Sequence, residues 1–268
     1  YSSVLAQLLQ SLGFKMLLIL RDPRDVVVSQ VKYISSSPTH PLHKHYRTLN
    51  FDEQIMTSIK GVEQGPIMPD IIKRVKSILQ WSEQPFTYTT YFEKLVGMRG
   101  GGSKKAQIDE VRNIADHLGF HFTESQLDAF TEQIFGGTVT FRKGKIGVWH
   151  ESFNEDHKKT FNTIAGDLLE NLGYQKNEKW IGGLKTKKQR KIEQVEKEYF
   201  GENLIFIISQ PRAGSTLLQR LLSGHTEILT TAEPWIMLHP LYALKKNGLI
   251  TEFDSNLARQ GLEDFISQ

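Results

Sequence analysis

The sequence predicts an α/β fold in which helices flank a parallel sheet. Two short apolar segments, Lys15–Leu20 and Leu204–Ile208, have the composition of strands that are buried on both faces. Each is followed by turn residues and then by a helical pattern of apolar residues. The connections between the predicted strands are too long for hairpins, so the alternation of strands and helices favours parallel pairing.

Composition narrows the class of protein. The chain has 268 residues, enough for one large or two small domains, and its 39% hydrophobic content is ordinary for a globular protein. The formal net charge of +3 is too small to indicate a nucleic-acid partner, and no apolar run approaches the roughly 20 residues of a membrane span. The absence of cysteine excludes disulfides, zinc–thiolate sites and thiol nucleophiles. We expect a cytoplasmic protein without a membrane span.

A helix is predicted directly after the first strand. Asp22 is placed to cap it, Pro23 suits its first position, and its apolar pattern continues over Val26–Tyr33. Ser29 falls on the same helical face as the start of the helix. Its hydroxyl is therefore expected to point the same way as the strand end that carries Arg21, which makes this junction a candidate anion site.

The middle of the chain continues the alternation. Helices are expected over 51–61 and 67–80, and Phe86–Tyr91 has the β-branched and aromatic content of a strand. Gly100–Ser103 is a flexible loop that precedes a helix ending at Gly119.

Three more helix boundaries are marked by local signals. Thr123 with Gln126 forms a capping box, and Gly136–Gly137 ends the helix that it starts. Asn154 is placed to cap a helix over Glu155–Asn171. The chain up to this helix is therefore expected to be regular α/β structure.

The second apolar strand leads into a P-loop-like turn, Pro211–Thr216, after which a helix restarts. The free N–H groups and the dipole at a helix N-terminus attract an anion, and the planar guanidinium of Arg212 matches phosphate or sulfate oxygens. The turn is not a Walker A sequence, because it lacks the first glycine and the lysine of that pattern. This difference weakens an assignment to ATP or GTP.

Four segments resemble sulfotransferases that use 3′-phosphoadenosine-5′-phosphosulfate (PAPS). Pro211–Leu218 resembles their 5′-phosphosulfate loop, and Arg21 followed by Ser29 resembles their 3′-phosphate site. Phe141–Trp149 resembles the Arg-Lys-Gly motif that closes over the same phosphate, and Tyr91–Val96 resembles the Tyr-Glu-Asp-Leu segment near the adenine. The joint occurrence of these motifs identifies the chain as a candidate member of that family.

The resemblance implies two sets of donor-binding residues. Those of the phosphosulfate loop are Arg212, Ala213, Gly214, Ser215, Thr216 and Leu217. Those of the 3′-phosphate and adenine sites are Arg21, Ser29, Phe92, Arg142, Lys143 and Gly144. Many family members carry Trp at position 217, so adenine packing is expected to depend on Phe92 instead.

Two residues are implied to be catalytic. Arg212 would offset the charge that grows on the leaving phosphate. Glu233 lies shortly after the loop helix and resembles the Glu that some branches of the family use as general base. A base there would need a pKa raised toward neutral, and a structural or exposed carboxylate remains the alternative.

The motifs are in an order that the family does not use, because the phosphosulfate loop comes last. We expect a sulfotransferase portion over 1–180, a charged linker over 181–200, and the family's N-terminal portion over 201–268. A permuted domain and a segment spanning two tandem modules both give this order. The second is favoured because the chain opens on Tyr1. In either case the two strands are expected to pair, within one chain or in a homodimer, since the donor needs both portions.

The implied reaction is transfer of a sulfuryl group from PAPS to a hydroxyl or amine acceptor, a small molecule or carrier-borne, which leaves 3′-phosphoadenosine 5′-phosphate (PAP). No metal is expected, because cationic side chains take the place that Mg²⁺ holds in kinases. His40, His43 and His45 lie in or beside a proline-containing loop and are interpreted as part of an acceptor-side surface. The alternatives are a P-loop nucleotide kinase-like phosphotransferase and a non-catalytic fragment that binds PAP or PAPS.

Overall fold

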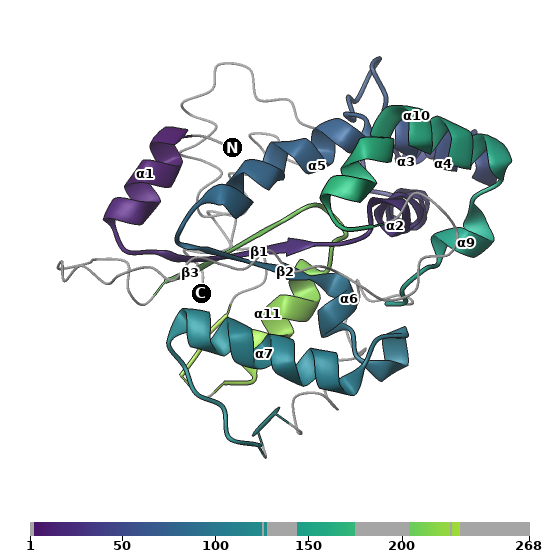
Figure 1. Cartoon of the computed structure of the whole chain (residues 1–268). Coiled ribbons are helices and arrows are strands. Elements are labelled where there is room, and N and C mark those ends of the chain that lie inside the picture. The colour runs from purple at the N-terminus through teal and green to yellow at the C-terminus, as the bar shows by residue number, and fades with distance from the viewer. Residues whose placement is uncertain (1–2, 125, 128–143, 175–203, 226, 231–268) are drawn as a thin grey trace.

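The computed structural model describes residues 3–124, 126–127, 144–174, 204–225 and 227–230 (Figure 1). The predicted linker at 181–200 and the predicted stop at Gly136–Gly137 lie outside these residues. The predicted site residues Arg142, Lys143 and Glu233 also lie outside them.

The strands of the described part form a three-stranded parallel sheet in the order β2-β1-β3. They are β1 (Lys15–Leu20), β2 (Thr87–Tyr91) and β3 (Ile205–Ser209). The fold class is confirmed as α/β with a parallel sheet between helices. β3 pairs with β1 within one chain, as expected, although it begins and ends one residue later than the predicted strand.

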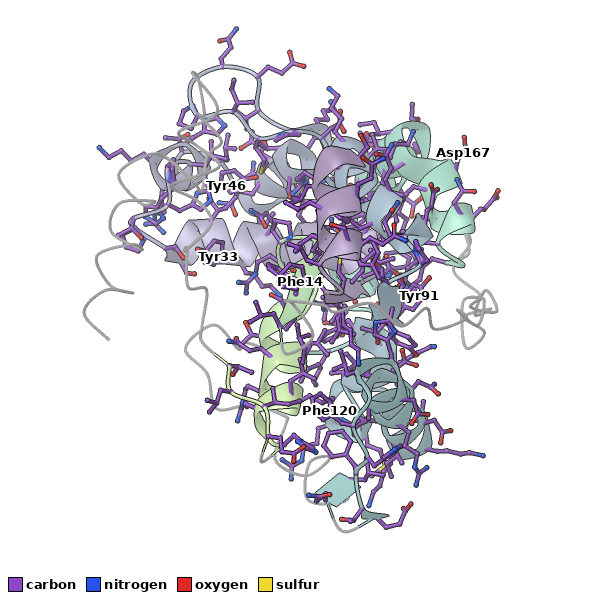
Figure 2. The ribbon with its side chains drawn as sticks, turned by 90° about the vertical axis from the view of Figure 1, so that its left-hand side faces the viewer. Phe14, Tyr33, Tyr46, Tyr91, Phe120 and Asp167 are labelled. Atoms are coloured by element: carbon purple, nitrogen blue, oxygen red, sulfur yellow. The ribbon has the colours of Figure 1, made fainter. Side chains whose placement is uncertain are left out.

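Helices cover both faces of the sheet (Figure 1). On one face lie α1 (Ser3–Ser11), α2 (Pro23–Ser36), α3 (His43–Arg47), α4 (Phe51–Lys60), α5 (Ile71–Leu79), α9 (Trp149–Ser152) and α10 (Glu155–Asn171), with the 3₁₀ turn η1 (Gln80–Glu83). On the other lie α6 (Phe92–Leu95), α7 (Lys104–Leu118) and α11 (Ser215–Ser223). The 3₁₀ turn η2 (Met98–Gly100) connects α6 to α7. Figure 2 shows Tyr33 and Tyr46 on the first side and Phe120 on the second.

β1 is the centre of the fold because its side chains alternate between two apolar cores. Met16, Leu18 and Leu20 enter the core beneath α2, whereas Leu17 and Ile19 enter the core beneath α7 and α11. None of these five side chains is more than 2% exposed. This confirms the prediction that the first strand is buried on both faces.

The same prediction is only partly correct for β3. Its apolar residues alternate between the same two cores, but all five residues of the strand are half-buried. Leu204, which the sequence placed in the strand, precedes it and is 54% exposed. The physical reason is position, since β3 lies at an edge of the sheet as far as the structure describes it.

Most predicted helix boundaries are confirmed by their caps. Asp22 caps α2 with Pro23 as its first residue, and Asn154 caps α10 in a capping box completed by His157. The reciprocal bonds of Thr123 with Gln126 are also present.

Two predicted helix boundaries are wrong. α2 continues past the predicted end to Ser36. α5 begins at Ile71 rather than at residue 67, because Met68 exchanges two backbone hydrogen bonds with Val62 and Asp70 caps the helix.

Candidate functional site

The carboxyl ends of the three strands bring the predicted donor-binding segments together. Leu20 pairs with Tyr91 and Ile19 pairs with Ser209, so the strands end at one edge of the sheet. Arg21, Phe92 and the loop that starts at Gln210 follow directly. Ligands of open α/β sheets bind outside this edge, and the structure therefore has one candidate site rather than two separate halves.

The phosphate loop is a tight turn with two left-handed residues. Arg212 has φ 68° and Gly214 has φ 105°, while the Ala213 N–H donates to the Gln210 carbonyl at 3.0 Å. A Cβ on Gly214 would lie only 2.7 Å from Cδ2 of Phe92. Glycine is required there both for its backbone angle and for the close approach of the aromatic ring.

α11 begins at Ser215 with Gly214 as its N-cap, and no side chain caps it within the described residues. Its first turn also carries no acidic residue. Ser215 and Thr216 are half-buried, so their hydroxyl and N–H groups lie near the surface at the positive end of the helix dipole. This end of α11 can receive an anion.

The side chain of Arg212 lies on α2. Its Nε is 3.5 Å from the Ser29 Oγ, and its Cζ lies 4.6 Å from the centroid of the Tyr33 ring. The predicted residues Arg212 and Ser29 are thus brought together although they are 183 positions apart. The sequence analysis missed Tyr33, which its spacing of one helical turn from Ser29 could have indicated.

Arg21 is in contact with the phosphate loop. Its Nη1 donates to the Arg212 carbonyl at 3.3 Å, and its Nη2 donates to the Lys145 carbonyl at 2.9 Å. The guanidinium carbon lies 4.2 Å above the centre of the Phe92 ring. The buried Nε of Arg21 has no hydrogen-bond partner in the described structure. One donor of this cation is therefore unsatisfied among the described residues.

Asp25 binds the C-terminal part of the segment that resembles the Arg-Lys-Gly motif. Its carboxylate accepts the Gly147 N–H at 2.8 Å and the Trp149 N–H at 3.0 Å, and it lies 3.7 Å from Nη2 of Arg21. Burial raises the pKa of Asp25 to about 6, against the lowering effect of the Arg21 charge. The sequence analysis did not assign this residue.

A second buried carboxylate, that of Glu93, binds the backbone between β1 and α2. Glu93 accepts the Asp22 N–H at 2.9 Å on one oxygen and bonds the Tyr174 hydroxyl at 2.8 Å through the other. Burial raises the pKa of Glu93 to about 7. Glu93 lies in the segment predicted to be near the adenine, but its contact with Tyr174 was not predicted, because local sequence offers no signal that would join residues 81 positions apart.

Arg24, at the start of α2, contacts both Asp22 and Trp149. The Arg24 guanidinium binds Asp22 through two nitrogens, at 2.9 Å and 2.6 Å, and lies 4.0 Å from the Trp149 ring centre. Arg24 is therefore held by Asp22 and Trp149.

The remaining predicted donor residues are largely buried. Ala213 is fully buried, and Leu217 and Phe92 are 9% and 4% exposed within one apolar core. Gly144 has a left-handed backbone with φ 49°. In this structure the Phe92 ring contacts Arg21 and lies close to Gly214, and little of it is left exposed to contact an adenine.

The three predicted acceptor-side histidines have local partners. His40 Nδ1 accepts the Leu42 N–H at 3.1 Å, and its ring packs edge-on against Tyr33 at 5.6 Å. His43 Nδ1 lies 2.8 Å from the Ile34 carbonyl, and the His45 ring packs near Tyr46. In the part of the chain that the structure describes, no group of His, Asp or Glu could hold a metal ion, and no helix is long and apolar enough to cross a membrane.

One comparison with known proteins agrees with the phosphate-loop motif. Residues 204–264 match the model described as the sulfotransferase family. The crystal structure of mouse sulfotransferase SULT7A1 complexed with PAP is similar over 61% of this chain and 60% of that chain, at 18% identity and a TM-score of 0.45. No curated protein matches the chain. The family match confirms the resemblance over residues 204–264, the segment that carries the phosphate loop.

Proposed function

We propose that the chain transfers a sulfuryl group from PAPS to a hydroxyl or amine of a small-molecule or carrier-borne acceptor. The observation that carries the proposal is the hydrogen bond from Arg21 Nη1 to the Arg212 carbonyl, which joins residues 191 positions apart. By resemblance, Arg21 serves the 3′-phosphate and the Arg212 loop serves the 5′-phosphosulfate. Their contact supports a single donor site.

The residues present fit a nucleotide with phosphates at both ends. Arg21 Nε is a buried donor without a partner, and a buried unsatisfied donor costs on the order of 1–3 kcal/mol. A phosphate oxygen at this nitrogen would remove that cost. The first turn of α11, which no acidic residue occupies, would hold the 5′-phosphate through Ser215 and Thr216.

PAPS supplies the sulfuryl group and leaves as PAP. Arg212 and the N–H groups of α11 would stabilise the negative charge that grows on the phosphate oxygen as its bond to sulfur breaks. Glu233 would take the proton of the acceptor as its oxygen or nitrogen bonds to sulfur. Because cationic side chains would stabilise the negative charge of the leaving phosphate, transfer is expected to proceed without added Mg²⁺.

The test is transfer of labelled sulfate from PAPS to a panel of lipids, phenols, sugars and polyketide-like alcohols, in the presence of EDTA. Labelled product is the expected result. Binding of PAP without transfer to any acceptor would instead favour a non-catalytic fragment. Transfer of phosphate from ATP that requires Mg²⁺ would favour a kinase-like protein.

A variant tests the base. Glu233→Gln should reduce turnover by roughly 10² to 10⁴ and leave PAP affinity nearly unchanged, because it removes proton transfer but keeps the shape of the side chain. Glu227→Gln, an exposed carboxylate of the same chain, is the matched control and should leave turnover unchanged. Full activity of Glu233→Gln would show that the base lies elsewhere.

A further inference from the structure

Asp25 joins two parts of the candidate site that are far apart in sequence. Its side chain is fully buried in the first turn of α2. The two backbone N–H groups that it accepts, from Gly147 and Trp149, lie 122 and 124 positions further along the chain. Its third neighbour is Arg21, one turn earlier.

A single oxygen of Asp25 contacts both Gly147 and Arg21. Asp25 Oδ2 accepts the Gly147 N–H at 2.8 Å and also lies 3.7 Å from Nη2 of Arg21. The same Nη2 donates to the Lys145 carbonyl at 2.9 Å. Asp25, Arg21, Lys145 and Gly147 therefore form a closed ring of interactions in which each member constrains the next.

We propose that Asp25 is a positioning residue of the donor site, which holds the Arg21 guanidinium and the segment 145–149 in the arrangement that receives the phosphate bound by Arg21. This inference rests on the proposed function and adds to it a residue that touches no ligand. It concerns affinity for the 3′-phosphate, not the chemistry at sulfur.

The neighbouring side chains are engaged in other contacts, so Asp25 is the group that positions Arg21 and the segment 145–149. Asp22 is held in a two-nitrogen pair with Arg24, so it is committed elsewhere. Trp149 stacks against Arg24 at 4.0 Å and His150 at 3.8 Å, which fixes its ring but leaves its backbone N–H to Asp25. Gly147 has φ 76°, a left-handed backbone that glycine adopts readily.

The orientation of Arg21 depends on this ring. Its plane rests on Phe92 and its Nη1 contacts the Arg212 carbonyl, while Nη2 is directed by Lys145 and Asp25. The guanidinium is rigid and planar, so fixing Nη2 also fixes the direction of the unpartnered Nε. Loss of the Asp25 charge should therefore misdirect the donor that meets the phosphate.

The experiment compares PAP with AMP, which lacks the 3′-phosphate, by calorimetry on the full chain. Asp25→Asn keeps the shape but replaces one acceptor oxygen with a donor that faces a backbone N–H. We expect it to weaken PAP binding at least about tenfold and to change AMP binding less than about twofold, since charge-assisted contacts are lost only at the 3′ end. Asp70→Asn is the matched control, because Asp70 caps α5 through the Lys73 N–H at 2.7 Å and lies on another helix. It should change neither affinity.

A second measurement uses the unaltered protein and does not depend on the folding of a variant. PAP should slow hydrogen exchange at the Gly147 and Trp149 amides more than AMP does at equal saturation. If PAP and AMP protect these amides equally, or if Asp25→Asn weakens both ligands by the same factor, the positioning role is overturned while the donor site stands. If the wild-type protein does not bind PAP, the proposed function itself fails, and this inference fails with it.

Discussion

Two strand-to-helix junctions meet at the same edge of the sheet, and they begin their helices in opposite ways. α2 starts with the side chain of Asp22 as its cap and with Asp25 in its first turn, both buried. α11 starts with Gly214, without a side-chain cap in the described structure and without an acidic residue in its first turn. We call the start of α2 the closed junction, because two buried carboxylates lie there. We call the start of α11 the open junction, because no acidic side chain lies in its first turn and no side chain caps it in the described structure.

The difference explains how one site could bind two phosphates differently. The Asp22 carboxylate accepts the Arg24 N–H of α2, and the Asp22 and Asp25 charges repel an anion, so a phosphate at this junction must be bound by cationic side chains such as Arg21. The N-terminus of α11 keeps the positive end of its dipole available. We therefore expect binding by a side chain at the first junction and by the backbone at the second.

The largest effect expected at the two junctions tests the open one. Arg212→Ala should reduce sulfuryl transfer by roughly 10² to 10³, because it removes a donor aimed at developing charge. The variant keeps a non-glycine residue at φ 68°, so the strain of the turn is retained. Turnover numbers with saturating PAPS measure the effect.

Arg112→Ala is the control for that variant. Arg112 lies on α7 and its side chain is 42% exposed in ion pairs with Asp109 and Glu124. It should leave turnover unchanged, since exposed pairs contribute little. Equal turnover of both variants would show that Arg212 is not part of the reacting site.

The next effect is the pH dependence of stability that comes from Glu93, which binds the Asp22 N–H at the closed junction. The pKa of Glu93 is raised by burial from 4.5 to about 7, so the folded protein favours the protonated carboxyl. The stabilisation is fully present below the unfolded value and is lost as pH rises through about 7. The unfolding free energy should fall by on the order of 3 kcal/mol from this group between these limits. Denaturant titrations across this range measure it.

Glu93→Gln is the comparison for the pH series. It keeps a neutral group that can bond both the Asp22 N–H and the Tyr174 hydroxyl, so its stability should vary less with pH. An unchanged pH dependence in this variant would assign the effect to another group.

A smaller effect tests the shape of the open junction. Gly214→Ala adds a methyl group 2.7 Å from the Phe92 ring, and overpacking of this kind costs about 1–3 kcal/mol. Gly65→Ala also lies at a positive φ, 75° against 105° at Gly214, but has nothing within 4 Å of the added atom. The difference in unfolding free energy between the two variants reports the contact with Phe92 together with the greater backbone strain at φ 105°. No difference would mean that Phe92 and the loop adjust without cost.

Sequence was sufficient where the signal is local. The apolar run of β1, the caps Asp22 and Asn154, and the turn of the phosphate loop are each determined by neighbouring residues, and each is present. The pairing of β3 with β1 followed from the need of one ligand for both portions.

Sequence was insufficient where a contact joins distant segments. Nothing near Asp25 indicates Gly147 and Trp149 as its partners, and nothing near Glu93 indicates Tyr174. The exposure of β3 also depends on its position in the sheet, which an apolar run does not encode. The early start predicted for α5 failed because the bridge between Val62 and Met68 competes with the helix.

The most direct test of one site with two kinds of phosphate contact is calorimetry with PAP, AMP and adenosine 3′-monophosphate. PAP should bind at least about tenfold more tightly than either monophosphate, because each end contributes charge-assisted hydrogen bonds. Arg21→Ala should reduce the advantage of PAP over AMP and weaken PAP binding by a larger factor than AMP binding. Equal affinity of the wild-type protein for PAP and AMP would contradict the account, because the two junctions would then not act on one nucleotide.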